Sequence, residues 1–269
     1  MKNKSIYRWI PVAVLALVLV ACDHVDDGDR LIYVKPVAVQ RAVLIEDFTG
    51  QRCVNCPTAT DVIHQLEQQY GDAVIAVGIH SGPFARSVKG TRYVLGTDEG
   101  DEYYAAWKLD HQPVGMVNRL RVSDYNEWPT QVYNEIQRTA PVSIDVTTTV
   151  DEATRQLQVN TAMMALDGTV KGKLQLWLVE DNVKAFQYLA DNTVNQDYIH
   201  NHVFRRAVNG TWGQDVNMAE AQTTTIASQT VLDAEWNIDN MSVVAFVYND
   251  GGVLQVTRKP LKEITLNEE

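Results

Sequence analysis

The chain has 269 residues, of which 45% are hydrophobic and 21% are charged, and its formal net charge is −11 at pH 7. This composition is ordinary for a globular protein, and the length suffices for one large domain or two smaller ones. So acidic a chain is not expected to bind nucleic acid, because phosphate backbones attract clustered positive charge.

The first 21 residues have the features of a signal peptide. A short basic start precedes an apolar run, Ile10–Ala21, which is short for a membrane span and stops at Cys22. This pattern resembles a bacterial lipoprotein signal, which implies cleavage before Cys22 and a lipid such as palmitate on that cysteine. An uncleaved anchor helix and a plain secretory signal are the alternatives.

Residues 22–40 are acidic and are predicted to form a solvated tether between a membrane and the folded body. Acidic residues at this place mark export to the cell surface in some lineages and retention at the inner membrane in others. With a lipid on Cys22, the remaining cysteines are Cys53 and Cys56, in an exported compartment where disulfides persist.

Residues 41–139 are predicted to form an α/β domain. An apolar run at 42–48 indicates a buried strand, and apolar residues at helical spacing after Pro57 indicate a helix that ends at Gly71. A second apolar run, 73–79, completes a β-α-β unit, in which the two strands are normally parallel.

The cysteines of DFTGQRCVNCP lie at the start of this helix. Backbone N–H groups at a helix N-terminus stabilise a thiolate, and Arg52 adds positive charge, so we expect a lowered pKa for Cys53. Cysteines spaced C-x-x-C can bridge one helical turn, so that Cys53 attacks a partner disulfide and Cys56 resolves the mixed disulfide.

A strand, a C-x-x-C at the mouth of a helix and a second strand resemble the thioredoxin superfamily, and Phe48 stands five residues before Cys53 as in thioredoxin. The dipeptide between the cysteines, Val54-Asn55, differs from the Gly-Pro of thioredoxin. Since this dipeptide helps to set the reduction potential, reductase, oxidant and isomerase all stay open.

The resemblance implies two further site residues. Asp47 corresponds to the buried carboxylate that moves the proton of the resolving Cys56, with Glu46 as its competitor. Because neighbours on a strand face opposite sides, only one of these acids can lie under the cysteines, and spacing favours Asp47. Pro113 corresponds to the cis-proline that shapes the substrate groove, with an ordinary trans loop proline as the alternative.

The cysteine pair also fits a metal site or a static clip. A metal site would require His64, His80 or His111 to converge on the cysteines, and none of them has a familiar ligand spacing. A static structural disulfide would suit a domain that only binds partners. The sequence predicts no metal and no cofactor.

Residues 140–269 are predicted to form an all-β domain, an Ig-like antiparallel β-sandwich, with a turn at Asn249–Gly252. The segment Asp197–Val216 is expected to lie outside the strands. Its His200-x-His202 pair indicates either a metal site or, more simply, two hydrogen-bonded loop histidines.

The lipoprotein start, the acidic tether and the motifs TGQxCxNCP, P-x-G-x-V-N-R and HNHVFRRAVNGTWG together resemble one family. It is the Bacteroidota outer-membrane lipoprotein family named for a twenty-eight-kilodalton outer-membrane protein, which joins a thioredoxin-like domain to a β-sandwich. The resemblance implies an outer-membrane location, on either the periplasmic or the cell-surface face.

Two functional hypotheses follow. In the first, the protein is a thiol–disulfide oxidoreductase that acts on exported protein thiols or disulfides through Cys53, Cys56, Asp47 and Pro113. In the second, it is a non-enzymatic binding protein or adhesin for an extracellular protein or glycan, and the disulfide is a clip. The first hypothesis expects Cys53 to be exposed beside Pro113, and the second expects both cysteines to be covered or far from that groove.

Overall fold

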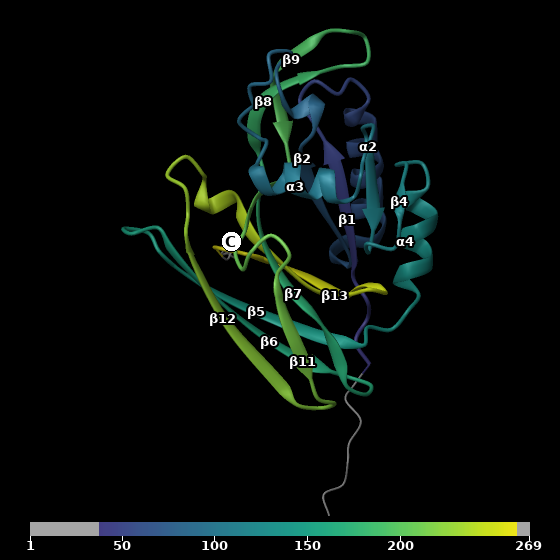
Figure 1. The fold of residues 1–269 in the computed structure, drawn as a ribbon, viewed down its shortest axis with the longest axis vertical. Coiled ribbons are helices and arrows are strands. Elements are labelled where there is room, and N and C mark those ends of the chain that lie inside the picture. The colour runs from purple at the N-terminus through teal and green to yellow at the C-terminus, as the bar shows by residue number, and fades with distance from the viewer. Residues whose placement is uncertain (1–37, 263–269) are drawn as a thin grey trace, which may run out of the picture. The chain divides into compact units, whose positions relative to one another are not determined.

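Strands from both halves of the chain share one nine-stranded mixed sheet in the computed structural model, which describes residues 38–262 (Figure 1). The strand order is β14-β13-β7-β10-β2-β1-β3-β4, and β11 pairs with β7. The predicted signal peptide, Cys22 and most of the tether lie outside the described residues. Between residues 38 and 262 no helix is both long and apolar enough to cross a bilayer.

The first half contains four strands and three α-helices: β1 (Val43–Thr49), α2 (Cys56–Tyr70), β2 (Val74–His80), α3 (Asp98–Ala106), β3 (Val114–Val117), β4 (Val122–Ser123) and α4 (Trp128–Ile136). The second half contains ten strands: β5 (Val142–Asp151), β6 (Gln156–Ala165), β7 (Val170–Glu180), β8 (Val183–Tyr188), β9 (Val194–His200), β10 (Val203–Ala207), β11 (Gln214–Met218), β12 (Thr223–Val231), β13 (Met241–Asn249) and β14 (Gly252–Pro260). The fold is therefore mostly β.

The predicted β-α-β unit is confirmed. β1 pairs in parallel with β2 on one side and antiparallel with β3 on the other, and all seven of its residues are buried, including the acids Glu46 and Asp47. α2 covers one face of these strands with Ile63 and Leu66, which lie in the same core as Ile45 of β1 and Val132 of α4. Gly71 ends α2 with φ 56°, a left-handed conformation that favours glycine.

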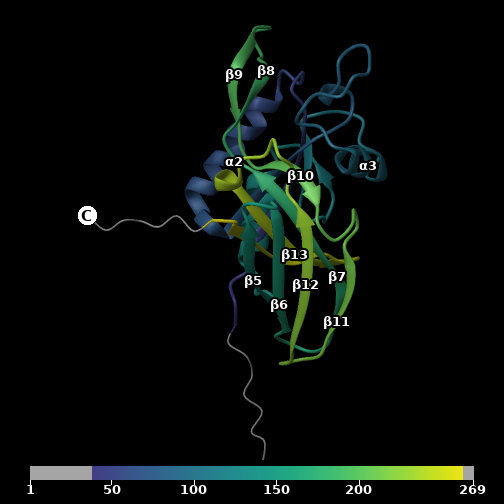
Figure 2. The same cartoon turned by 90° about the vertical axis from the view of Figure 1, so that its left-hand side faces the viewer.

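A second, three-stranded antiparallel sheet of order β12-β6-β5 lies against the large sheet (Figure 2). Alternate residues of β6, among them Leu157 and Val159, are buried in one core with Leu174 of β7 and Val243 of β13. The alternation of buried and less buried residues along β6 matches the period of two that a sheet with one covered face requires.

The segment Asp197–Val216 corrects one prediction, because it is not a loop. It contains the end of β9, all of β10 and the start of β11. β10 pairs antiparallel with β7 and, through Val203 and Gly78, in parallel with β2. This strand joins the two halves in one sheet, and the division into domains 41–139 and 140–269 stays a prediction.

A buried ion pair within the first half of the chain lies against aromatic rings of the second half. Glu46 is fully buried, and Arg119 donates to its two carboxylate oxygens through Nε and Nη2 at 3.0–3.1 Å. The Arg119 guanidinium also lies 4.4–6.0 Å from the centres of four aromatic rings, those of Trp107, Trp177, Phe246 and Tyr248. Three of these rings, on β7 and β13, come from the second half.

Replacing Arg119 with methionine is expected to lower the free energy of unfolding by about 3–5 kcal/mol, because the Glu46 carboxylate is left buried without its cation. Urea denaturation of the oxidised protein measures this. Arg121→Met is the matched control, since Arg121 pairs with Glu127 at the surface and an exposed pair contributes about 1 kcal/mol or less. Equal losses in the two variants would contradict the structural role of the buried pair.

Candidate functional site

The cysteine pair lies in the loop between β1 and α2. Cys53 and Cys56 form a disulfide with their Cα atoms 5.4 Å apart. Cys56 is the first residue of α2, and Pro57 occupies the first turn, where a missing N–H removes no helical hydrogen bond. The cysteines therefore pair with each other at the start of the predicted helix.

Asp47 lies on β1 below this disulfide. Its neighbour on β2, Gly78, has no side chain, and a Cβ atom there would meet nothing closer than 3.7 Å, whereas its neighbour on β3, Gly115, packs closely against Trp128. Asp47 and Cys56 line a cavity of about 30 Å³, which is large enough for a water molecule. The remaining lining residues are Thr49, Pro57, Thr60, Gly78, His80, Gln187, Tyr198, His200 and Asn201. Asp47 thus has the predicted position, and its role in proton transfer stays a prediction.

Burial sets the protonation states of the titratable side chains around this cavity. Loss of solvation raises the pKa of Asp47 to about 7, although the nearby charge of His202 opposes the shift. Burial lowers the pKa of His200 to about 4 and also lowers the pKa of His80 well below its usual value, so both rings are neutral at pH 7. Among the described residues, Asp47 Oδ1 has no hydrogen-bond partner. Asp47 can therefore gain or lose a proton near neutral pH.

The β8–β9 hairpin covers the cysteine loop from one side, at the end of the sheet where α2 begins (Figures 1 and 2). Gln187 Nε2 donates to the carbonyl oxygen of Cys53 at 2.8 Å, and the Tyr188 N–H donates to the carbonyl oxygen of Gln51 at 2.9 Å. Cys53 is only 2% exposed and Cys56 only 1%. The disulfide is therefore closed to solvent.

Residues 80–97 cover the loop from another side. The Arg52 N–H donates to the carbonyl oxygen of Phe84 at 3.0 Å. A Cβ atom on Gly50 would lie 2.5 Å from the backbone carbonyl carbon of Phe84, so this close approach requires glycine. The rings of Tyr93 and Phe186 are 4.9 Å apart and connect this segment to the hairpin.

Pro113 lies at the same end of the sheet as the cysteines. The Gln112–Pro113 peptide bond is cis, as expected from the resemblance. Val114, the next residue, pairs with Phe48 of β1, and Gln112 Nε2 donates to the carbonyl oxygens of Thr49 at 2.8 Å and Ser81 at 3.1 Å. The structure thus brings Asp47, Cys53, Cys56 and Pro113 to one end of the sheet.

The hairpin residues that complete this site carry no recognisable signal in the sequence. Gln187 belongs to a strand whose sequence contains no known motif. The spacing His200-x-His202 suggests that the two histidines act together, and does not suggest that His200 lies near the cysteines. The three histidines considered as cysteine partners do not converge. Only His80 lines the cavity, whereas His64 lies near Glu67 and His202, and exposed His111 contacts Asp110 and Asp124.

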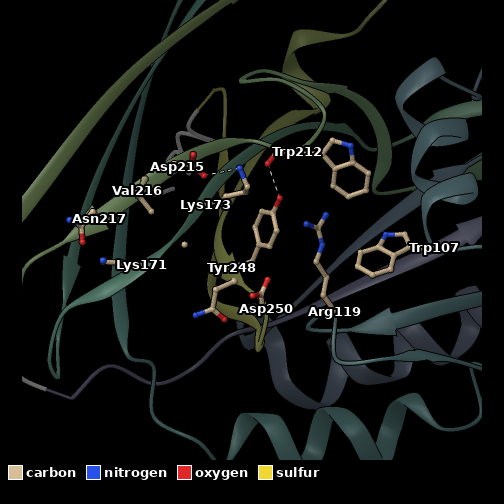
Figure 3. Close-up of a pocket in the computed structure, with 12 residues that line it drawn as sticks. Trp107, Arg119, Lys171, Lys173, Trp212, Asp215, Val216, Asn217, Tyr248 and Asp250 are labelled. Carbon is tan, nitrogen blue, oxygen red and sulfur yellow. Dashed lines mark hydrogen bonds and ion pairs between the residues drawn. The ribbon is translucent and has the colours of Figure 1, made fainter.

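A separate groove of about 870 Å³ lies where α3, β7, β11 and β13 meet (Figure 3). Trp107, Trp212 and Tyr248 give it aromatic walls, and its charged lining is mixed, because Lys171 and Lys173 lie beside Asp215 and Asp250 and Lys173 pairs with Asp215 at 2.7 Å. Arg119 also lines it. Tyr248 donates its hydroxyl hydrogen to the carbonyl oxygen of Trp212 at 2.7 Å, which holds two of these walls together.

Replacing Asp47 with asparagine tests the raised pKa. The folded carboxyl keeps its proton up to about pH 7, whereas the unfolded one loses it near pH 3.8, so stability falls between these pH values as pH rises. Asp47→Asn removes this loss of stability. Going from pH 4 to pH 8, the free energy of unfolding of the variant is therefore expected to rise relative to that of the wild type by up to about 4 kcal/mol. Urea denaturation at both pH values measures the gain, with exposed Asp61→Asn as control. A pH-independent difference would contradict the shift.

Three solved structures are similar to this chain. HBP35 of Porphyromonas gingivalis has a TM-score of 0.65 at 17% identity, covering 86% of this chain and 79% of that one. A protein from Agrobacterium tumefaciens has a TM-score of 0.55 at 16% identity, covering 86% of this chain and 100% of that one. A domain of the outer membrane lipoprotein Omp28 from Porphyromonas gingivalis has a TM-score of 0.33 at 23% identity, covering 46% and 89%.

The first two structures indicate a shared fold and nothing more, because their identities are low. No curated protein matches the chain. The family model of the outer membrane protein Omp28 matches residues 100–265, which is more than half of the chain and confirms the family that the motifs indicated. The chain therefore belongs to the Omp28 family of outer membrane proteins.

Proposed function

We propose that this outer membrane protein is anchored by a lipid on Cys22 and exchanges disulfides with exported proteins through Cys53 and Cys56. In this proposal residues 41–139 are a thioredoxin-like domain and residues 140–269 a β-sandwich. The buried carboxyl group of Asp47 beside Cys56, whose Oδ1 has no hydrogen-bond partner among residues 38–262, carries the proposal. A static clip gains nothing from an acid that burial destabilises, whereas an exchange reaction needs a group that accepts a proton near neutral pH.

The exchange follows from the placement of these groups. In the reduced protein the Cys53 thiolate attacks one sulfur of a substrate disulfide, that S–S bond breaks, and a mixed disulfide forms. Cys56 then gives its proton to the Asp47 carboxylate, through a water molecule in the cavity, and attacks the Cys53 sulfur. The substrate leaves as two thiolates with two electrons from the cysteine pair and takes up one proton from Asp47 and one from water. The reverse sequence oxidises a substrate dithiol.

The covered disulfide adds a condition to this proposal. A substrate sulfur cannot approach Cys53 while the β8–β9 hairpin keeps Gln187 on its carbonyl oxygen. Exchange therefore requires the hairpin to leave the cysteine loop. Elements that move in this way are held by few and separable contacts, and the hairpin pairs with no strand of the large sheet.

The alternative function is binding without catalysis, and two observations favour it. Both cysteines are covered, as this hypothesis expects. The groove with walls of Trp107, Trp212 and Tyr248 offers a separate surface, and aromatic rings beside lysines suit a protein or a glycan partner (Figure 3).

The reduction potential separates the two functions. For the full-length protein in detergent, equilibrated with glutathione buffers, we expect a value between about −120 and −270 mV, the range of exchange catalysts. Alkylation of free thiols followed by mass spectrometry measures the reduced fraction, with Cys53→Ser as the blank. A value below about −300 mV would identify a structural disulfide and favour the binding function.

Gln187→Ala tests the gating by the hairpin. The variant loses the hydrogen bond to Cys53, and because such a bond contributes about 1 kcal/mol, the disulfide should be reduced by dithiothreitol roughly 5-fold faster. Lys184→Ala is the control in the same hairpin, since Lys184 pairs with Asp197 at the surface. An unchanged rate in Gln187→Ala would show that hairpin opening does not limit access.

A further inference from the structure

Three side chains that can bind a metal ion converge beside the second half of α2. His64 and Glu67 stand three residues apart on one face of the helix, and His202 lies between β9 and β10. One ligand atom of each residue lies within 4.8 Å of the other two. Glu67 Oε1 is 3.0 Å from His202 Nε2. The cluster therefore joins segments far apart in the sequence.

The surroundings of His202 fix the direction of its ring. His202 has a φ of 56°, which is uncommon for a residue with a side chain, and its backbone N–H donates to Asp181 Oδ1 at 2.8 Å. Its ring Nδ1 lies 3.3 Å from the same oxygen. Asp181 is also paired with Arg258, which lies on the Nδ1 side of the ring. His202 Nε2 is thereby turned toward α2.

A carboxylate behind a histidine is the usual support of a metal-binding imidazole, because it fixes the ring and raises the basicity of the other nitrogen. The carboxylates of Glu67 and Asp181 lie 3.0 Å and 3.3 Å from the two ring nitrogens of His202. Their negative charge favours a divalent cation beside this ring.

We propose that His64, Glu67 and His202 bind a divalent transition metal such as Zn²⁺. Two imidazoles and one carboxylate are a donor set that zinc accepts, with a fourth position left for water or another ligand. The Glu67 and His202 side chains are 25% and 14% exposed, so the cluster lies near the surface, with His202 Nε2 itself buried. Within residues 38–262 the His64 ring has no hydrogen-bond or ion-pair partner, and its nitrogens are available.

Zinc–nitrogen bonds of about 2.0–2.1 Å place ligand atoms about 3.3 Å apart in a tetrahedral site. The contact between Glu67 and His202 is already near this distance. The adjustment therefore falls on the His64 side chain, which no described contact restrains. The bound ion would tie α2 to the turn that follows β9, and this inference does not depend on disulfide exchange.

Calorimetric titration of the metal-free, untagged full-length protein with Zn²⁺ tests the site. We expect one ion per chain with micromolar or tighter affinity. His64→Gln and His202→Gln each remove a ligand and should weaken binding by roughly 100-fold or more, whereas Asp181→Asn, which removes the supporting carboxylate, should weaken it by about 10- to 100-fold. His111→Gln is the control, because exposed His111 is paired with Asp110 and Asp124, away from this cluster.

Unfolding curves without metal identify variants that fail to fold. If His202→Gln fails, His64→Gln decides, since His64 makes no hydrogen bond or ion pair with the described residues that the substitution would remove. The proposal is overturned if Zn²⁺ does not bind in the micromolar range, if His64→Gln binds as tightly as the wild type, or if His111→Gln weakens binding equally.

Discussion

The buried pair of Glu46 and Arg119 is the constraint on which the arrangement of the first half depends. A carboxylate inside a sheet must be neutralised, and Arg119 does so with two nitrogen atoms while its guanidinium lies among aromatic rings from both halves. Because neighbours on a strand face opposite sides, the direction of Glu46 also sets that of Asp47. The cation of this pair thus contacts aromatic rings of the second half, and the direction of Glu46 places Asp47 on the side of the disulfide.

The local part of this fold was predictable because it depends on short patterns. Apolar residues at the start of β1 and along β2 predicted these two strands, and helical spacing with a terminal Gly71 predicted α2. The spacing from Cys53 favoured Asp47 over Glu46 as the acid near the cysteines. The contact of β10 with β2 was not predictable, since Val203 and Gly78 are distant in sequence and the segment around Val203 is rich in polar residues. Pairing of this kind is decided by tertiary packing rather than by local propensity.

The candidate site also has a part that the sequence predicts and a part that it does not. The cysteines and Pro113 belong to motifs, whereas the hairpin that covers them has no motif of its own. The pattern His200-x-His202 suggested a joint role for two histidines, yet His200 ends β9 and lines the disulfide cavity, while His202 has a left-handed backbone and turns toward Glu67. Residues two apart lie on the same face only when both belong to one strand. β9 ends at His200, before His202, so the two side chains face different ways.

The parallel pairing of β10 with β2 has a consequence for the biogenesis of an exported protein. The first half of a chain emerges first during synthesis. Until the residues around Val203 follow, the β2 edge beside Gly78 has no neighbouring strand and presents free backbone N–H and C=O groups, which are a template for pairing with other chains. Between the emergence of the two halves, this open edge of β2 is therefore exposed to pairing with other chains.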